Sequence, residues 1–128
     1  MLNELAKECF EIAKANGFNS YTKENEDLVI PRDLMLIVSE LSEALEALRH
    51  NKRADLQLYA FDTNNSAAEF NKTGFETWIK DSFEDEICDT IIRLLHLCGV
   101  MGIDIDMHVY LKMEYNKTRE HKHGGKKF

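Results

Sequence analysis

The chain has 128 residues, so we expect a single domain over residues 1–128 with its own hydrophobic core. Hydrophobic residues make up 44% and prolines number only one, which favours an all-α globular chain. A net charge of −7 argues against non-specific nucleic-acid binding, and no apolar run approaches the roughly 18 residues of a membrane span. The three cysteines lack C-x-x-C spacing and the N-terminus is unlike a signal peptide, so we expect a cytoplasmic protein with reduced thiols.

The first expected helix covers residues 2–16, where apolar residues recur at helical spacing and Asn16-Gly17 supplies an end signal. Residues 18–30 have no clean period and are expected to form a loop. Pro31 is well placed for the first turn of the next helix.

The second expected helix, residues 33–50, carries a heptad-like apolar seam that should face the core. The seam consists of Leu34, Val38, Leu41, Leu45 and Leu48. Glu40 and Glu43 lie about 100° and 160° around the helix from Leu41. These two carboxylates therefore share one flank of the seam.

Residues 51–80 give a weaker signal and are expected to form a long connection with short helical pieces. Connections of this length inside a compact domain are often lids or binding segments. Phe75 and Trp78 are candidates for a platform on which a nucleobase stacks. The more ordinary interpretation of each aromatic side chain is burial in a small core.

The third expected helix, residues 81–102, begins with a capping-box-like pair, Ser82 and Asp85, and should stop near Gly99 and Gly102. Its apolar stripe is expected to face the core. The stripe consists of Phe83, Ile87, Ile91, Leu94, Cys98 and Met101.

Glu86 and Asp89 on this helix lie about 100° and 160° from Ile87, with Arg93 between them on the next turn. This is the offset that Glu40 and Glu43 have from Leu41. Carboxylates three residues apart are neighbours and repel each other, so such a pair is suited to sharing a cation. Packing of the two helices through their stripes would bring four carboxylates to one cleft.

A fourth helix is expected after a cap at Asp104 or Asp106, with an inner face at Met107, Leu111, Tyr115 and Thr118. Lys112, Asn116 and Arg119 form a row on another face. A lysine, an amide and an arginine can hold phosphate oxygens and a sugar hydroxyl. The alternative is an ordinary solvated face. Residues 112–128 hold six Lys/Arg against two acids, which would suit a phosphate-bearing ligand or simply a soluble terminus.

The order Glu40-x-x-Glu43, Glu86-x-x-Asp89, Lys112-x-x-x-Asn116-x-x-Arg119 and HGGKKF resembles the MazG-like all-α nucleoside triphosphate pyrophosphohydrolases. The resemblance covers nearly the whole chain outside residues 51–80. It departs from the family at Ser39, where a further Glu is usual, and in the length of the connection between the acidic motifs.

The resemblance implies a bundle of four main helices that assembles as a homodimer or homotetramer. It implies Mg²⁺, or Mn²⁺, held by Glu40, Glu43, Glu86 and Asp89, and cleavage of a nucleoside triphosphate substrate between the α- and β-phosphates. Carboxylate oxygens are the ligands that Mg²⁺ prefers, and a metal-bound water is a suitable nucleophile. Glu40 or Glu43 would serve catalysis, with Glu40 the more plausible proton acceptor. Lys112, Asn116, Arg119 and Trp78 would contact the substrate.

Two alternatives remain open at this stage. The first keeps the fold and changes the substrate, to phosphoribosyl-ATP or to dUTP alone. The second is a non-catalytic helical bundle whose acidic faces serve solubility or partner docking. A di-iron carboxylate bundle is disfavoured because it requires Glu-x-x-His on two helices, and the one such spacing is Glu120-x-x-His123 in the tail.

Overall fold

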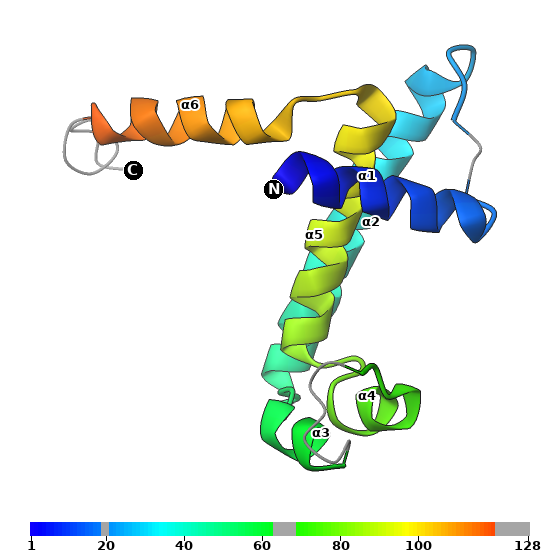
Figure 1. Cartoon of the computed structure of the whole chain (residues 1–128), viewed down its shortest axis with the longest axis vertical. Coiled ribbons are helices and arrows are strands. Elements are labelled where there is room, and N and C mark those ends of the chain that lie inside the picture. The colour runs from blue at the N-terminus through cyan, green and yellow to red at the C-terminus, as the bar shows by residue number, and fades with distance from the viewer. Residues whose placement is uncertain (19–20, 63–68, 120–128) are drawn as a thin grey trace. The chain divides into compact units, whose positions relative to one another are not determined.

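The computed structural model describes residues 1–18, 21–62 and 69–119, which form six α-helices and no β-strand (Figure 1). This confirms the all-α prediction. The chain divides into two compact units, residues 1–19 with 95–128 and residues 20–94, and helix α5 (Phe83–Met101) contributes to both. The basic tail and the Glu120-x-x-His123 spacing lie outside the described residues. None of the described helices is long and apolar enough to cross a membrane.

The first unit contains α1 (Leu2–Ala15), the last turns of α5 and α6 (Ile105–Lys117). Its small core is formed by Ala6, Cys9 and Leu95. A Cβ added at Gly99 would lie 2.9 Å from the carbonyl oxygen of Ala6, so α1 and α5 can approach this closely only at a glycine. Gly99 therefore serves close helix packing, and the expectation that it stops α5 is wrong.

Capping groups at the start of α6 also organise the first unit. Asp104 caps α6 by accepting a hydrogen bond from the Met107 N–H at 3.2 Å, as the sequence predicted. The Asp106 carboxylate accepts the N–H groups of Leu2 and Asn3 at 2.9 and 3.1 Å. Asp106 thus satisfies donors that the first turn of α1 leaves without helical partners, and it joins the two helices.

The second unit contains α2 (Glu26–Arg49), α3 (Leu56–Asp62), α4 (Lys72–Trp78) and the first three turns of α5. Helix α2 begins seven residues earlier than the period of the sequence indicated, so Pro31 lies inside the helix rather than at its first turn. Pro31 lacks an N–H, and the carbonyl of Asp27 loses its helical partner. In its described residues, the connection 51–80 contains the short helices α3 and α4, as predicted.

Helices α3 and α4 pack on each other through a glycine and a tyrosine. Asn71 caps α4 by accepting the Gly74 N–H at 2.9 Å, and Gly74 is buried beneath the ring of Tyr59. The Tyr59 hydroxyl in turn accepts the Asn71 N–H at 3.0 Å. The connection is therefore an ordered helical pair in its described part.

The apolar stripes of α2 and α5 are not buried as the sequence led us to expect. All five residues of the α2 seam, Leu34 to Leu48, are between 43% and 49% exposed. The buried residues of α2 lie on another face: Val29, Ile37, Ala44 and Ala47. On α5, Ile91, Leu94 and Met101 are exposed. Phe83 and Ile87 are half-buried, and Cys98 packs against the small core of the first unit. The predicted core face is therefore wrong for α2 and holds only in part for α5.

The predicted inner face of α6 is also exposed, at Met107, Leu111 and Tyr115. The common reason for these errors is that helical periodicity identifies an apolar face without identifying its partner. On α2, alanines at positions 44 and 47 form the buried face, and small side chains permit close approach of a neighbouring helix.

Candidate functional site

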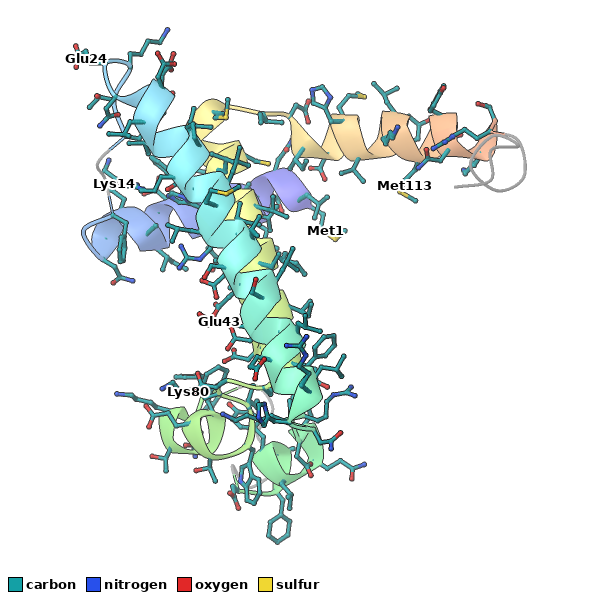
Figure 2. All side chains as sticks on the ribbon, turned by 180° about the vertical axis from the view of Figure 1, so that it is seen from behind. Met1, Lys14, Glu24, Glu43, Lys80 and Met113 are labelled. Atoms are coloured by element: carbon teal, nitrogen blue, oxygen red, sulfur yellow. The ribbon has the colours of Figure 1, made fainter. Side chains whose placement is uncertain are left out.

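Three of the four predicted carboxylates meet in the second unit. Glu40 and Glu43 of α2 and Glu86 of α5 each place an oxygen within 4.8 Å of the other two (Figure 2, where Glu43 is labelled). The spacing of three residues puts Glu40 and Glu43 on adjacent turns of α2. Carboxylate oxygens from two helices thus converge on one place, and three such oxygens can serve a hard cation.

Burial distinguishes the members of this group. Glu86 is only 6% exposed, and the Glu40 side chain is 12% exposed, whereas Glu43 faces solvent. Among the described residues, no hydrogen-bond donor or cationic side chain contacts the Glu86 carboxylate. A buried carboxylate without such partners is unfavourable when it is charged.

The pKa of Glu86 reflects this environment. Burial raises it from its ordinary value of 4.5 to about 7, and the negative charges of Glu43, Asp89 and Glu40 add to the effect. Both causes disfavour the ionised form in the absence of a nearby cation. A divalent ion at this position would favour the ionised form and would be bound with release of the Glu86 proton.

Asp89 lies one turn after Glu86 and is not part of the closely spaced group of three. Its pKa is nevertheless raised, first by burial and then by Asp85 and Glu40, while Arg93 acts in the opposite direction. Asp89 is therefore electrostatically coupled to the group and can complete the ligand set from its rim.

Arg93 forms the closest ion pair of the group. Its Nε donates to Glu40 Oε1 at 2.6 Å, which links α5 to α2. The sequence placed Arg93 on the flank of Glu86 and Asp89 but did not indicate a bond to Glu40. The sequence does not show how α2 is rotated about its own axis relative to α5. The seam expected to pack against α5 is exposed, and a different face of α2 carries the contact.

A second acidic group was missed because Asp85 was interpreted only as a cap. Asp81, Asp85 and Glu86 also place one oxygen each within 4.8 Å of one another. Asp85 accepts the Asp81 N–H at 2.8 Å, and Asp81 lies 3.9 Å from the ammonium groups of Lys52 and Lys80. These contacts give Asp81 and Asp85 a structural role at the N-terminus of α5.

Trp78 and Phe75 both lie on α4, in the same unit as the carboxylates. The Trp78 indole N–H donates to the Asp62 carboxylate, and its carbonyl accepts the Asp55 N–H at 2.9 Å. The Phe75 ring is tilted against that of Phe70, with centroids 6.0 Å apart. Both side chains are partly buried, so each has a packing role in the α3–α4 pair.

The basic row lies in the first unit. Lys112 and Asn116 are exposed on α6, and Arg119 follows just after the helix. The Lys112 ammonium group lies 5.1 Å from the centroid of the Tyr115 ring. Lys112 also lines a shallow hollow with His108, Val109 and Met113. The three side chains are available to a ligand at this face of α6.

Comparison with known proteins adds no relative: no family model, no curated protein and no solved structure matches the chain.

Proposed function

We propose that this protein hydrolyses a nucleoside triphosphate, preferably a deoxynucleoside triphosphate, between the α- and β-phosphates in a Mg²⁺-dependent reaction. The products would be a nucleoside monophosphate and pyrophosphate. The observation that carries the proposal is the convergence of Glu40, Glu43 and Glu86 from two helices, with the pKa of buried Glu86 raised to about 7. Strongly perturbed carboxylates in one group are typical of functional sites.

The donor set fits Mg²⁺ or Mn²⁺, because all of the converging atoms are hard carboxylate oxygens and no sulfur or imidazole is among them. Glu40, Glu43 and Glu86 would hold the ion, with Asp89 at the rim. Such an ion neutralises phosphate charge and lowers the pKa of a bound water. Glu86 would release its proton on cation binding, since its raised pKa stems from burial and repulsion.

The chain's own groups supply the remaining roles in the proposal. Glu40 would accept the proton of the attacking water, once it is free of its pairing with Arg93. Lys112 and Arg119 would offset negative charge on the phosphates, and Asn116 would hold a sugar hydroxyl. For Trp78 the ring face is the part that would stack on the base, because the indole N–H already donates to Asp62.

We further infer that the chain assembles with a second copy of itself through the exposed α2 seam. The α2 seam from Leu34 to Leu48 follows heptad spacing and is 43–49% exposed throughout. Heptad seams are buried by a second helix that offers the same kind of seam, and an identical chain supplies one. The assembly would be a homodimer or homotetramer in the cytoplasm, where nucleoside triphosphates are available.

The test is pyrophosphate release from each of the eight common NTPs and dNTPs, measured with Mg²⁺ and with EDTA. We expect Mg²⁺-dependent pyrophosphate release, lost in Glu43→Gln and kept in Glu76→Gln, an exposed glutamate on α4. Activity on dUTP alone, or on phosphoribosyl-ATP, would select the narrower enzymes of the same fold. Orthophosphate as the first product, or full activity in EDTA, would refute the proposal.

The exposed α2 seam also favours a second candidate function, a non-catalytic interaction module. An apolar helix face of this length is typical of a docking surface. This candidate predicts no turnover of any nucleotide and no response of the melting temperature to Mg²⁺. The substrate panel therefore distinguishes it from the enzyme.

A further inference from the structure

Arg93 is a cationic side chain that pairs with the group of carboxylates. In the part of the chain that the structure describes, it is the one Lys or Arg that forms an ion pair with any of Glu40, Glu43, Glu86 and Asp89. The bond joins Arg93 Nε to Glu40 Oε1 at 2.6 Å, and Arg93 also holds the pKa of Asp89 below the value that burial and repulsion would set. Its guanidinium thus lessens the repulsion within the group.

A guanidinium in this position competes with a metal ion. It occupies an oxygen of Glu40, and it places a positive charge where a cation would have to approach. The pair is not locked in the interior, because the Glu40 side chain is 12% exposed but that of Arg93 is 43% exposed. Arg93 can therefore leave Glu40 toward solvent, and the incoming cation would then neutralise the Glu40 carboxylate in its place.

A released Arg93 would have a further use. Among the described residues, its two Nη groups have no hydrogen-bond partner. An arginine offers five N–H donors in a fixed fork, which matches the oxygens of a phosphate group. Because Arg93 stays attached to α5 one turn after Asp89, its fork remains close to any phosphate that the metal site holds.

We propose that Arg93 is an exchangeable counter-ion: it neutralises Glu40 in the metal-free protein, is displaced by a divalent cation, and then binds phosphate oxygens of the substrate. This inference rests on the proposed function and adds a substrate-positioning residue to it. It makes a signed prediction, because loss of Arg93 should strengthen metal binding and weaken phosphate binding. If the ion pair between α2 and α5 were merely structural, loss of Arg93 would not change metal affinity and phosphate affinity in opposite directions.

The first measurement titrates the whole protein with Mn²⁺ alone, followed by the loss of the free Mn²⁺ EPR signal. Arg93→Gln is expected to bind Mn²⁺ on the order of tenfold more tightly than wild type, since both competition and repulsion are removed. Arg93→Lys keeps the charge and should stay near wild type. Arg32→Gln is the matched control: it removes one positive charge from α2, about 12 Å along the helix from Glu40, where Arg32 pairs with Asp33.

The second measurement titrates the Mn²⁺-loaded proteins with pyrophosphate by calorimetry. Arg93→Gln is expected to bind pyrophosphate on the order of tenfold more weakly than wild type, and Arg93→Lys should be intermediate because it lacks the fork. Arg32→Gln should match wild type in both titrations. Circular dichroism melts of all four proteins in EDTA verify that each is folded.

The outcomes separate this inference from the function on which it rests. If wild type binds no Mn²⁺, the proposed function fails and the inference fails with it. If wild type binds Mn²⁺ but Arg93→Gln binds it with equal or lower affinity, the inference alone is overturned. Unchanged pyrophosphate affinity in Arg93→Gln also overturns it, because displacement without a phosphate role is only half of the proposal.

Discussion

Glu86 offers the sharpest test of the site without any substrate. It is buried, has no described partner for its carboxylate, and lies against Glu40 and Glu43. We predict that Glu86→Gln stabilises the metal-free protein at neutral and alkaline pH. The amide has nearly the same shape as the carboxylate and no charge, and it can donate to the neighbouring carboxylates.

The magnitude follows from the raised pKa. Below pH 4.5 the Glu86 carboxyl is protonated in both states, so the substitution should change little. Between pH 4.5 and about 7 the unfolded chain loses this proton while the folded chain keeps it, so the free energy of unfolding of wild type falls as pH rises. At pH 8 the accumulated loss is on the order of 3 kcal/mol as an upper bound.

The assay is thermal unfolding in EDTA at pH 4.5, 6, 7 and 8, followed by circular dichroism. We expect Glu86→Gln to match wild type at pH 4.5 and to melt progressively higher above it, by about 3–5 °C for each 1 kcal/mol in a domain of this length. Glu76→Gln, which replaces an exposed glutamate, should show no such trend. A lower melting temperature of Glu86→Gln at pH 8, or a gain independent of pH, would show that repulsion at this carboxylate is not significant.

Three further predictions concern the metal, the basic row and the assembly. At a hundredfold excess over Kd, Mg²⁺ should raise the free energy of unfolding of wild type by about 2.7 kcal/mol, and hence the melting temperature, beyond the effect of NaCl at equal ionic strength. Glu43→Gln should lose most of this gain, and an equal response of both proteins would contradict a metal site there. Lys112→Ala and Asn116→Ala should each lower kcat/KM tenfold to a hundredfold, which corresponds to about 1.4–2.7 kcal/mol. The melting temperature should change little, because both side chains are exposed on α6. Wild-type kinetics in both variants would mean that the row is an ordinary solvated face. Leu41→Glu with Leu45→Glu should convert an oligomer to a monomer in light scattering, and an unchanged mass would mean that the α2 seam is not the interface.

The helices themselves were largely predictable from local signals. The cap at Asp104, the Ser82 hydroxyl that accepts the Asp85 N–H at 3.2 Å, and the end of α5 at Gly102, which has a positive φ, all have short-range causes. The start of α2 was missed because helix 26–49 includes a proline, and propensity places a proline at the first turn. Tertiary context outweighed that preference.

The proximity of the carboxylates was predicted for a reason that the structure does not support. Equal angular offsets from two apolar stripes suggested that packing of the stripes would gather the acids. The stripes are exposed at Leu41 and Ile91, and the buried faces carry Ala44, Glu86 and Thr90 instead. Helical periodicity places the acids on one flank of each helix, but it does not show which flank a neighbouring helix covers.

The two strongest sequence signals in α2 are its acidic flank and its leucine seam, and the described residues of the single chain neither fully neutralise the first nor bury the second. The acidic flank of α2 converges with Glu86 of α5, whose pKa burial raises to about 7. The leucine seam of α2 remains nearly half exposed. A cation would relieve the first and a second helix would cover the second, and neither can substitute for the other. Under the proposed function, folding is then linked to two binding equilibria, so the stability of the protein should depend on metal concentration and on its own concentration.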